Sequence, residues 1–158
     1  MPTNSDMDHA YRANIDLYGH YARAIDARDW PKLSGLFTDD ATFGFTQSPA
    51  SPDADVTYVE GREAVIDMIR SFISVLSASH HLTSSYLVEI SDDGDSACSS
   101  AYFRAYHAGK DERAHLFQES LGRFDLETVR LGSQWKIRRM LEIMMLDLGT
   151  HDAFGIDT

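Results

Sequence analysis

The sequence predicts an α+β fold in which helices pack on one face of an antiparallel sheet. Two patterns support this prediction. Apolar residues recur at helical spacing in the first half of the chain, and the second half consists of strand-like segments separated by turn signals. With 158 residues, of which 43% are hydrophobic and 25% charged, the chain is expected to form one domain over residues 1–158.

The N-terminal segment predicts a long helix over roughly residues 7–28. An apolar stripe steps through it at spacings of four and three, formed by Tyr11, Ile15, Tyr18, Ala22 and Ile25. Asp29 precedes Trp30-Pro31 and predicts the N-cap of a short second helix, "WPKLSGLF", because proline is tolerated in a first helical turn.

The next segments predict a strand, a loop, a short strand and a third helix. "DDATFGFT" alternates like a strand, with Ala41, Phe43 and Phe45 on one face. "TQSPASPDAD" holds two prolines and predicts a loop, and "VTYVE" predicts a short strand. After Gly61 a second stripe at helical spacing predicts the third helix, through Val65, Ile69, Phe72 and Leu76.

The remainder of the chain predicts an antiparallel meander. Its strands are "HHLTSSYLVEI", "SACSSAYFRAYH", "RAHLFQESLGRFDLETV" and "QWKIRRMLEIMMLDL", and the turn signals between them are "SDDGD", "AGKDE" and "RLGS". The last segment, "GTHDAFGIDT" (149–158), is interpreted as a flexible tail or a lid over a pocket.

Charge and composition exclude several classes of partner. The formal net charge is -11, so no nucleic acid or acidic membrane surface is expected to bind, because both favour clusters of Lys and Arg. Cys98 is the single cysteine, which rules out an internal disulfide and a multi-cysteine zinc site. The sequence contains no apolar run of about 20 residues and no signal-peptide pattern, so a cytoplasmic location is expected.

Two residues stand out as candidates for chemistry. Asp26 falls on the apolar stripe of the first helix, near its C-terminal end, where burial and the helix dipole both disfavour a carboxylate. Either Asp26 has a compensating partner, or the helix frays and Asp26 is solvated beside Asp29. His107 ends a strand face of small residues, which indicates either a cavity wall or a histidine that meets water, and that face comprises Ala97, Ser99, Ala101, Phe103 and Ala105.

The adjacent pair His80 and His81 must point to opposite faces of its strand. Strict alternation places His80 with Leu82, Tyr86, Val88 and Ile90, and His81 with Thr83, Ser85, Leu87 and Glu89. Alternation alone does not decide which of these faces is the interior.

Four segments carry a family resemblance that covers nearly the whole chain: "YARAIDARDWPKLSGLFTDDATF", "GREAVIDMI", "HLTSSYLVEISDDGDSACSSAYF" and "GSQWKI". The sequence resembles the SnoaL-like branch of the NTF2-like superfamily, and within it the group of scytalone dehydratase, hexachlorocyclohexane dehydrochlorinase and bile-acid 7α-dehydratase. The resemblance implies an NTF2-like cone, in which a curved antiparallel sheet and N-terminal helices enclose a pocket.

The same resemblance assigns candidate catalytic residues. Asp26 falls on an aspartate that pairs with a catalytic histidine, and His81 falls on that histidine, with Glu89 eight residues after it. His107 matches a second active-site histidine, and Tyr21 matches a tyrosine that the bile-acid enzyme uses. Ile25 stands where the scytalone enzyme has a tyrosine, and no asparagine lies near Gly122, so scytalone is not predicted as the substrate.

These residues suit a cofactor-independent lyase of the dehydratase type. His81, oriented by Asp26, would take a proton, and His107 with Tyr21 or Tyr18 would polarise a carbonyl or protonate the leaving hydroxide. A small hydrophobic cyclic substrate, such as a polyketide, terpenoid or steroid, is expected in a pocket lined by Phe43, Phe72, Phe103, Leu141 and Met144. A homo-oligomer, trimer or dimer, is expected from the resemblance.

Alternatives remain open from the sequence. An isomerase or polyketide-type cyclase could use the same aspartate–histidine pair, and a non-catalytic NTF2-like subunit or ligand-binding module could use the same fold. A hydrolase would need other polar residues around its water. A metal site formed by His81, His107 and Asp26 is a further alternative, but no metal is predicted, because an aspartate bonded to the base explains the same residues.

Overall fold

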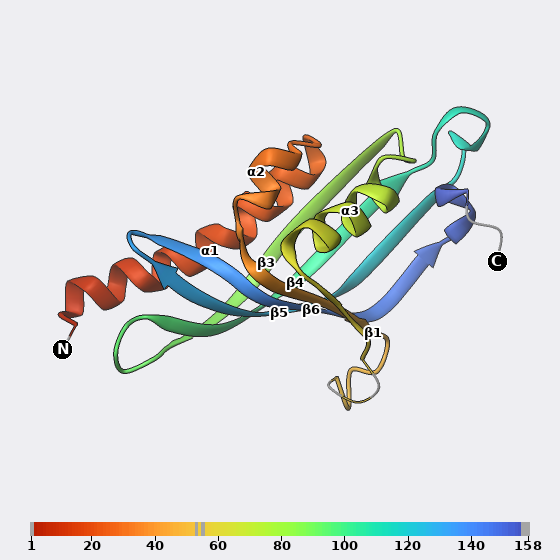
Figure 1. Ribbon diagram of the computed structural model, residues 1–158. Helices are drawn as coiled ribbons and strands as arrows, with labels where there is room; N and C mark the ends of the chain where they lie inside the picture. The colour runs from red at the N-terminus through yellow and green to blue at the C-terminus, as the bar shows by residue number, and fades with distance from the viewer. Residues whose placement is uncertain (1, 53, 55, 156–158) are drawn as a thin grey trace.

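The computed structural model describes residues 2–52, 54 and 56–155. The predicted loop therefore includes two positions, 53 and 55, outside the described residues. Along the described chain (Figure 1) the elements are α1 (Asn4–Asp26), α2 (Trp30–Ser34), β1 (Phe37–Thr46), β2 (Tyr58–Glu60), α3 (Arg62–Ile73), β3 (Ala78–Ile90), β4 (Ser96–Ala108), the 3-10 helix η1 (Asp111–Arg113), β5 (Phe117–Leu131), β6 (Gln134–Gly149) and the 3-10 helix η2 (His151–Phe154).

One curved, unclosed sheet has the strand order β2-β1-β6-β5-β4-β3, and the three α-helices cover one of its faces (Figure 1). The α+β prediction and the cone-like NTF2 fold are confirmed. The last four strands form the predicted antiparallel meander. One pair differs from the antiparallel pattern, because β1 lies parallel to β6. The chain leaves β1 through β2 and α3 to the far edge of the sheet, and the meander then returns to β1.

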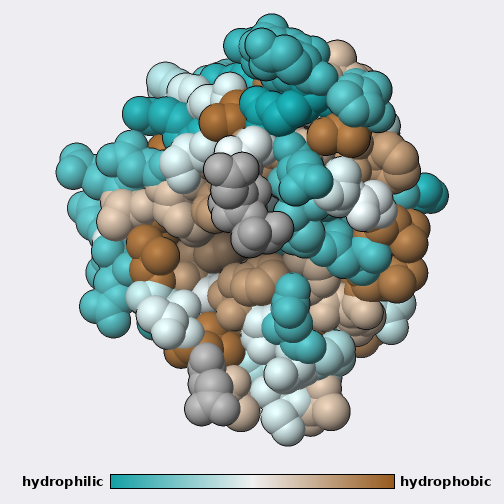
Figure 2. Space-filling view, turned by 90° about the vertical axis from the view of Figure 1, so that its right-hand side faces the viewer, coloured by the Kyte–Doolittle hydropathy of each residue, from teal (hydrophilic) through white to brown (hydrophobic). Residues whose placement is uncertain are grey.

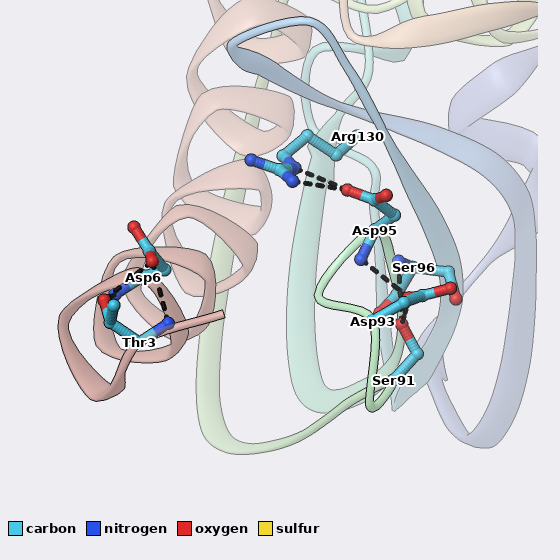
Figure 3. Close-up of polar contacts among 7 residues, drawn as sticks. All are labelled: Thr3, Asp6, Ser91, Asp93, Asp95, Ser96 and Arg130. Carbon is cyan, nitrogen blue, oxygen red and sulfur yellow. Dashed lines mark hydrogen bonds and ion pairs between the residues drawn. The ribbon is translucent and has the colours of Figure 1, made fainter. Parts of the chain in front are cut away.

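Helix α1 begins three residues earlier than predicted because Thr3 caps it. The Thr3 backbone N–H and hydroxyl donate to the Asp6 carboxylate at 2.9 and 2.6 Å, and the Thr3 hydroxyl accepts from the Asp6 N–H at 3.2 Å (Figure 3). Such a capping box satisfies N–H groups that have no partner within the helix. The helix ends at Asp26, two residues before the predicted end, since Arg28 has a φ of 54° and cannot continue it.

The buried face of α1 differs from the predicted stripe in its first half. Tyr11 is 42% exposed, whereas Asn14 is fully buried. Asn14 is tolerated there because its amide donates to the Ala10 carbonyl at 2.9 Å and its oxygen accepts from the Thr128 hydroxyl at 2.5 Å. A buried, fully bonded asparagine is not visible in a count of apolar residues, which explains the error.

The turn between β3 and β4 follows the predicted signal "SDDGD". The Ser91 hydroxyl and the Asp95 N–H both donate to the Asp93 carboxylate, at 2.6 and 3.0 Å (Figure 3). Arg130, which leads into the turn between β5 and β6, donates to the Asp95 carboxylate at 2.8 Å. The Arg130–Asp95 bond thus joins the end of β5 to the β3–β4 turn, at the end of the sheet beside the start of α1 (Figure 3).

Helix α3 ends at Ile73, before the end of the stripe that predicted it. Leu76 is buried, but it follows the helix, and Phe72 is 45% exposed. The residues that α3 buries are Val65, Ile66, Ile69 and Ile73.

A β-bulge in β3 changes which side chains share a face. Ser84 pairs with Tyr102 and Leu87 with Ser100, so β3 has one more residue than β4 across this interval. Ser85 lies in the interval with a φ of 56°. The extra residue reverses the alternation. The faces predicted for His80 and His81 are therefore wrong beyond the bulge, and His81 shares the inner face with Tyr86, Val88 and Ile90.

Within the described residues, no helix is both long and apolar enough to span a membrane.

Candidate active site

A cavity of about 400 Å³ lies between the inner face of the sheet, the end of α1, α3 and η2. Figure 2 views the end of the molecule that carries the C-terminal segment, and it shows a hollow near the centre of this face with hydrophobic surface along part of its rim. The volume is within the range of small-molecule sites. Its lining is largely apolar and aromatic and consists of Tyr21, Ile25, Phe43, Phe45, Gln47, Met68, Ile69, Phe72, Ile73, His81, Ala105, His107, Gln118, Ser120, Phe124, Glu142, Met144, His151 and Phe154.

Asp26 is held against β3 by three hydrogen bonds. One carboxylate oxygen lies 2.7 Å from Nδ1 of His81 and accepts from the Ser79 hydroxyl at 3.0 Å, and the other accepts from the His81 backbone N–H at 2.9 Å. Burial raises the pKa of Asp26, but the hydrogen bonds from His81 and Ser79 outweigh burial and leave the pKa below its usual value. Of the two alternatives for Asp26, the structure therefore shows the compensating partner. The carboxylate is bonded to His81 and is not simply solvated beside Asp29.

This pairing determines the tautomer of His81. The ionised Asp26 carboxylate can only accept, so Nδ1 of His81 carries the proton and Nε2 has a free lone pair. The His81 side chain is 7% exposed and lines the cavity. His80 points to the outer face and is exposed. The arrangement gives the cavity a histidine with a basic nitrogen.

His107 lies beside His81, with 5.5 Å between the ring centroids. Its Nδ1 is 2.6 Å from Oε1 of Gln118. The Gln118 amide nitrogen donates to the Ser120 hydroxyl at 2.6 Å and to the Asp147 carboxylate, which fixes the amide orientation because a carboxylate only accepts. Oε1 therefore faces His107, and Nδ1 of His107 carries the proton in the neutral ring.

His107 is uncharged at neutral pH. Two causes lower the pKa of His107 to about 4: burial is the larger, and the positive charge that His81 can carry is the smaller. Nε2 of His107 is therefore a hydrogen-bond acceptor, which suits recognition of a hydroxyl better than polarisation of a carbonyl. Of the two alternatives for His107, the structure shows the cavity wall, because His107 is buried and lines the cavity, but Ala105 is the one described residue of the small strand face that lines it too. The other end of this strand face lies against α1, where Ser99 contacts Tyr18.

The two candidate tyrosines lie in different surroundings. Tyr21 lines the cavity and packs edge-on against Phe124, with 5.7 Å between ring centroids. Burial, with a smaller effect of Glu142, raises the pKa of Tyr21 well above its usual value, so its hydroxyl keeps its proton. Tyr18 is 1% exposed, and its hydroxyl lies 2.9 Å from that of Ser99. Tyr18 is not among the described residues that line the cavity.

Three of the five predicted lining residues, Phe43, Phe72 and Met144, line the cavity. Phe103 and Leu141 are not part of the described lining. Leu141 lies next to Glu142 on β6, and alternation turns its side chain to the other face. Phe103 supports the wall indirectly, stacked on Phe124 at 4.1 Å.

Several cavity residues were not predicted from the sequence, and Glu142 is the most unusual of them. Glu142 lies on β6 in the segment "MLEIMML", and a charged residue within an apolar strand was the available signal. Burial raises its pKa to about 7. Its carboxyl has no hydrogen bond or ion pair with any described residue, and the exposed part of its side chain is cavity wall.

The C-terminal segment also reaches the cavity. Phe154 lies 5.2 Å from His107 and 6.4 Å from Phe72, measured between ring centroids. His151 bonds through Nε2 to the Asp147 carboxylate, and both His151 and Phe154 are part of the lining. The final part of the segment predicted as a flexible tail or a lid, 156–158, lies outside the described residues.

No group of three or more His, Cys, Asp and Glu side chains in the described part of the chain is placed to hold a metal ion.

Comparisons with known proteins agree with the fold. A family model described as a SnoaL-like domain matches residues 9–141. No curated protein matches the chain significantly. Among solved structures, a protein of Novosphingobium aromaticivorans described as an aromatic ring hydroxylase is 25% identical, with a TM-score of 0.72 over 90% of this chain and 94% of that one.

Two further structures share the fold at lower identity. A protein described as a scytalone dehydratase, also from Novosphingobium aromaticivorans, is 17% identical, with a TM-score of 0.78 over 94% of this chain and 93% of that one. A hexachlorocyclohexane dehydrochlorinase from Novosphingobium barchaimii is 15% identical, with a TM-score of 0.76 over 99% of this chain and 98% of that one.

Proposed function

This chain belongs to the SnoaL-like family, and on that premise we propose that it is a lyase that dehydrates a small, hydrophobic, cyclic carbonyl compound. The observation that carries the proposal is the pairing of Asp26 with Nδ1 of His81 on the wall of an apolar cavity. An imidazole oriented by a carboxylate, with its other nitrogen free, is a general base.

In the proposed reaction, Nε2 of His81 takes a proton from the carbon next to the substrate carbonyl. The C–H electron pair forms an enolate, whose return expels hydroxide from the neighbouring carbon. The proton on His81 then passes to the hydroxide, so water leaves and His81 is neutral again. Asp26 stabilises the imidazolium formed between these steps, and Tyr21 is proposed to donate to the carbonyl oxygen.

The cavity supports the proposed class of substrate. Phe43, Phe72, Phe124 and Phe154 provide aromatic surface, and the volume of about 400 Å³ suits a compact ring system. The Nε2 atom of His107 provides an acceptor for the hydroxyl that leaves. The proposed dehydration needs no cofactor, because the side chains of the cavity supply the base and the hydrogen-bond donor.

An isomerase or cyclase would use the same proton abstraction without expelling a group. A second candidate function comes from the likeness to the protein described as an aromatic ring hydroxylase. If this chain serves such an enzyme as a ligand-binding subunit, its cavity would bind an aromatic compound without turnover.

A mass-resolved screen of cyclic β-hydroxy ketones tests the proposal, with His81→Ala and Asp26→Asn beside the wild type. A product lighter by one water that both variants suppress supports a dehydratase. A product of unchanged mass with the same dependence indicates an isomerase or cyclase. Turnover that survives in both folded variants contradicts the role of the Asp26–His81 pair.

Self-association is proposed through the outer face of β3 to β6. The helices leave this face uncovered, and a set of large apolar side chains is exposed on it, which a solvated monomer rarely shows. We call this set the outer apolar patch; it comprises Leu82, Tyr102, Tyr106, Phe117, Leu146 and Leu148.

A further inference from the structure

The two histidines of the cavity leave few hydrogen-bond donors for an enolate oxygen. His81 donates its Nδ1 proton to Asp26, and His107 donates its Nδ1 proton to Gln118. In their neutral forms both rings therefore present an unprotonated Nε2, which accepts a hydrogen bond and cannot donate one. The donor that an enolate oxygen requires must come from another wall of the cavity.

Glu142 is placed to supply such a donor. On the neighbouring strands its register partners are Phe45 and Phe124, and on its own strand Met144 faces the same way, so apolar side chains surround it. Arg123 on β5 and Arg139 on β6 alternate to the other face of the sheet, where Arg123 donates to Asp125 and Arg139 to Glu127. No described residue neutralises or bonds the Glu142 carboxyl.

Tyr21 faces the same cavity from α1. Tyr21 packs edge-on against Phe124, which pairs with Glu142 across β5 and β6. After burial, the negative charge that Glu142 can carry is the second cause that raises the pKa of Tyr21. No described residue forms a hydrogen bond with its hydroxyl. The Glu142 carboxyl and the Tyr21 hydroxyl therefore lie in an otherwise apolar part of the cavity wall, and neither has a hydrogen-bond partner among the described residues.

We propose that Glu142, in its protonated form, donates a hydrogen bond to the carbonyl oxygen of a neutral cyclic ketone and forms an oxyanion site together with Tyr21. This inference rests on the proposed function and specifies its substrate class. When His81 removes the proton, the negative charge moves to the ketone oxygen. Glu142 keeps its own proton throughout, so the balance of the reaction is unchanged.

Physical chemistry supports the protonated form. A carboxyl without a cationic partner loses solvation energy on ionisation in an apolar wall, which is why burial raises the pKa of Glu142 to about 7. A carboxylic acid kept neutral in this way can donate a hydrogen bond. The other titratable groups that line the cavity are Tyr21, His81, His107 and His151, and among the described residues none of them forms a hydrogen bond or ion pair that would stabilise an ionised Glu142.

The test uses 2-tetralone, a cyclic hydrophobic ketone, as the probe, with binding measured by calorimetry at about pH 6 and about pH 9. Three proteins are compared: wild type, Glu142→Gln, which keeps a neutral donor at every pH, and Glu142→Leu, which has none. Glu112→Gln, an exposed glutamate in η1, is the matched control. Infrared difference spectra of the wild type against Glu142→Gln report the protonation state without any activity.

Three binding results and one infrared result are expected. Wild type binds 2-tetralone several-fold more tightly at the lower pH, Glu142→Gln binds equally at both, and Glu142→Leu binds weakly at both. The infrared difference shows a carboxylic acid band at the lower pH that disappears at the higher one. Lack of that band, lack of tetralone binding by the wild type, or wild-type affinity in Glu142→Leu would each overturn the inference.

These outcomes separate the inference from the proposed function. If the donor site is present but no β-hydroxy ketone loses water, the oxyanion site stands and the dehydratase assignment fails. If dehydration depends on His81 but Glu142→Leu has no effect on kcat or on tetralone binding, the dehydratase stands and the oxyanion site fails.

Discussion

The carboxylate of Asp26 bonds both to the ring of His81, at 2.7 Å from Nδ1, and to the backbone N–H of the same residue, at 2.9 Å. One side chain on the last residue of α1 therefore sets the position and the tautomer of a residue on β3. The same bonds compensate the carboxylate for its place at a helix C-terminus, where the helix dipole disfavours negative charge.

Asp26→Asn is expected to lower kcat of the dehydration by roughly 10²–10⁴-fold, because an amide neither stabilises the imidazolium nor enforces the tautomer. The measurement is steady-state kinetics on a substrate identified in the screen, with circular dichroism to verify folding. Asp16→Asn, an exposed aspartate of the same helix, is the control and should retain full activity. A folded Asp26→Asn protein with wild-type kcat would remove Asp26 from the mechanism.

Gln118 is expected to hold His107 in one tautomer. In nitrogen NMR spectra of the wild type, Nε2 of His107 should stay unprotonated from neutral pH until the ring titrates near its pKa of about 4. Gln118→Leu removes the acceptor for the Nδ1 proton, so both tautomers should appear at neutral pH. Gln134→Leu, at an exposed position, should leave the spectrum unchanged. A single unchanged His107 tautomer in Gln118→Leu would show that Gln118 does not position this ring.

The raised pKa of Glu142 predicts that the folded chain loses stability as the pH rises from acid to neutral. The unfolded chain releases this proton near the ordinary value of 4.5, but the folded chain releases it only near 7. Stability is therefore lost as the pH rises from about 4.5 through 7, by roughly 3 kcal/mol for the full shift. In urea unfolding, Glu142→Leu should gain stability relative to the wild type between pH 5 and pH 8, in line with the same linkage. An equal difference at both pH values would contradict the shift.

Much of the fold could be predicted from local signals. Helical spacing located α1 and α3, and glycine- and aspartate-rich turns located the meander. The ends of the helices depended on bonds that spacing does not reveal, such as the cap from Thr3 to Asp6. The parallel pairing of β1 with β6 is set by how the whole chain returns to its first strand, which no local pattern contains.

The site was predictable where a residue violated a local rule. Asp26 on an apolar stripe indicated either a partner or a frayed helix end, and the resemblance identified His81 as the partner. Gln118 was not predictable, because its role depends on the β4–β5 register that places it opposite His107. The faces of β3 were predicted wrongly because a bulge is a backbone feature, and serine at position 85 gives no signal for the positive φ it adopts.

The bulge in β3 allows a prediction about Ser85. Its φ of 56° is costly for any residue that has a Cβ atom. Ser85→Gly removes that cost and should stabilise the fold by up to about 1 kcal/mol in urea unfolding. Ser85→Val should destabilise it, because a β-branched residue disfavours this conformation. Ser84→Gly, at the neighbouring position that pairs normally with Tyr102, serves as the control and should be neutral or destabilising. A destabilised Ser85→Gly would contradict a strained bulge.

The outer apolar patch makes the final prediction, which concerns assembly. Tyr106 and Phe117 stack on this face with 5.5 Å between ring centroids, and Tyr106 is 40% exposed. Tyr106→Lys places a charge within the patch, so it should shift the protein from an oligomer to monomer in sedimentation velocity, because burying an unpaired charge opposes association. Tyr11→Lys is the matched control, since Tyr11 is 42% exposed on α1, away from the patch, and its variant should keep the wild-type state. A monomeric wild type, or an oligomer that Tyr106→Lys leaves intact, would contradict self-association through this face.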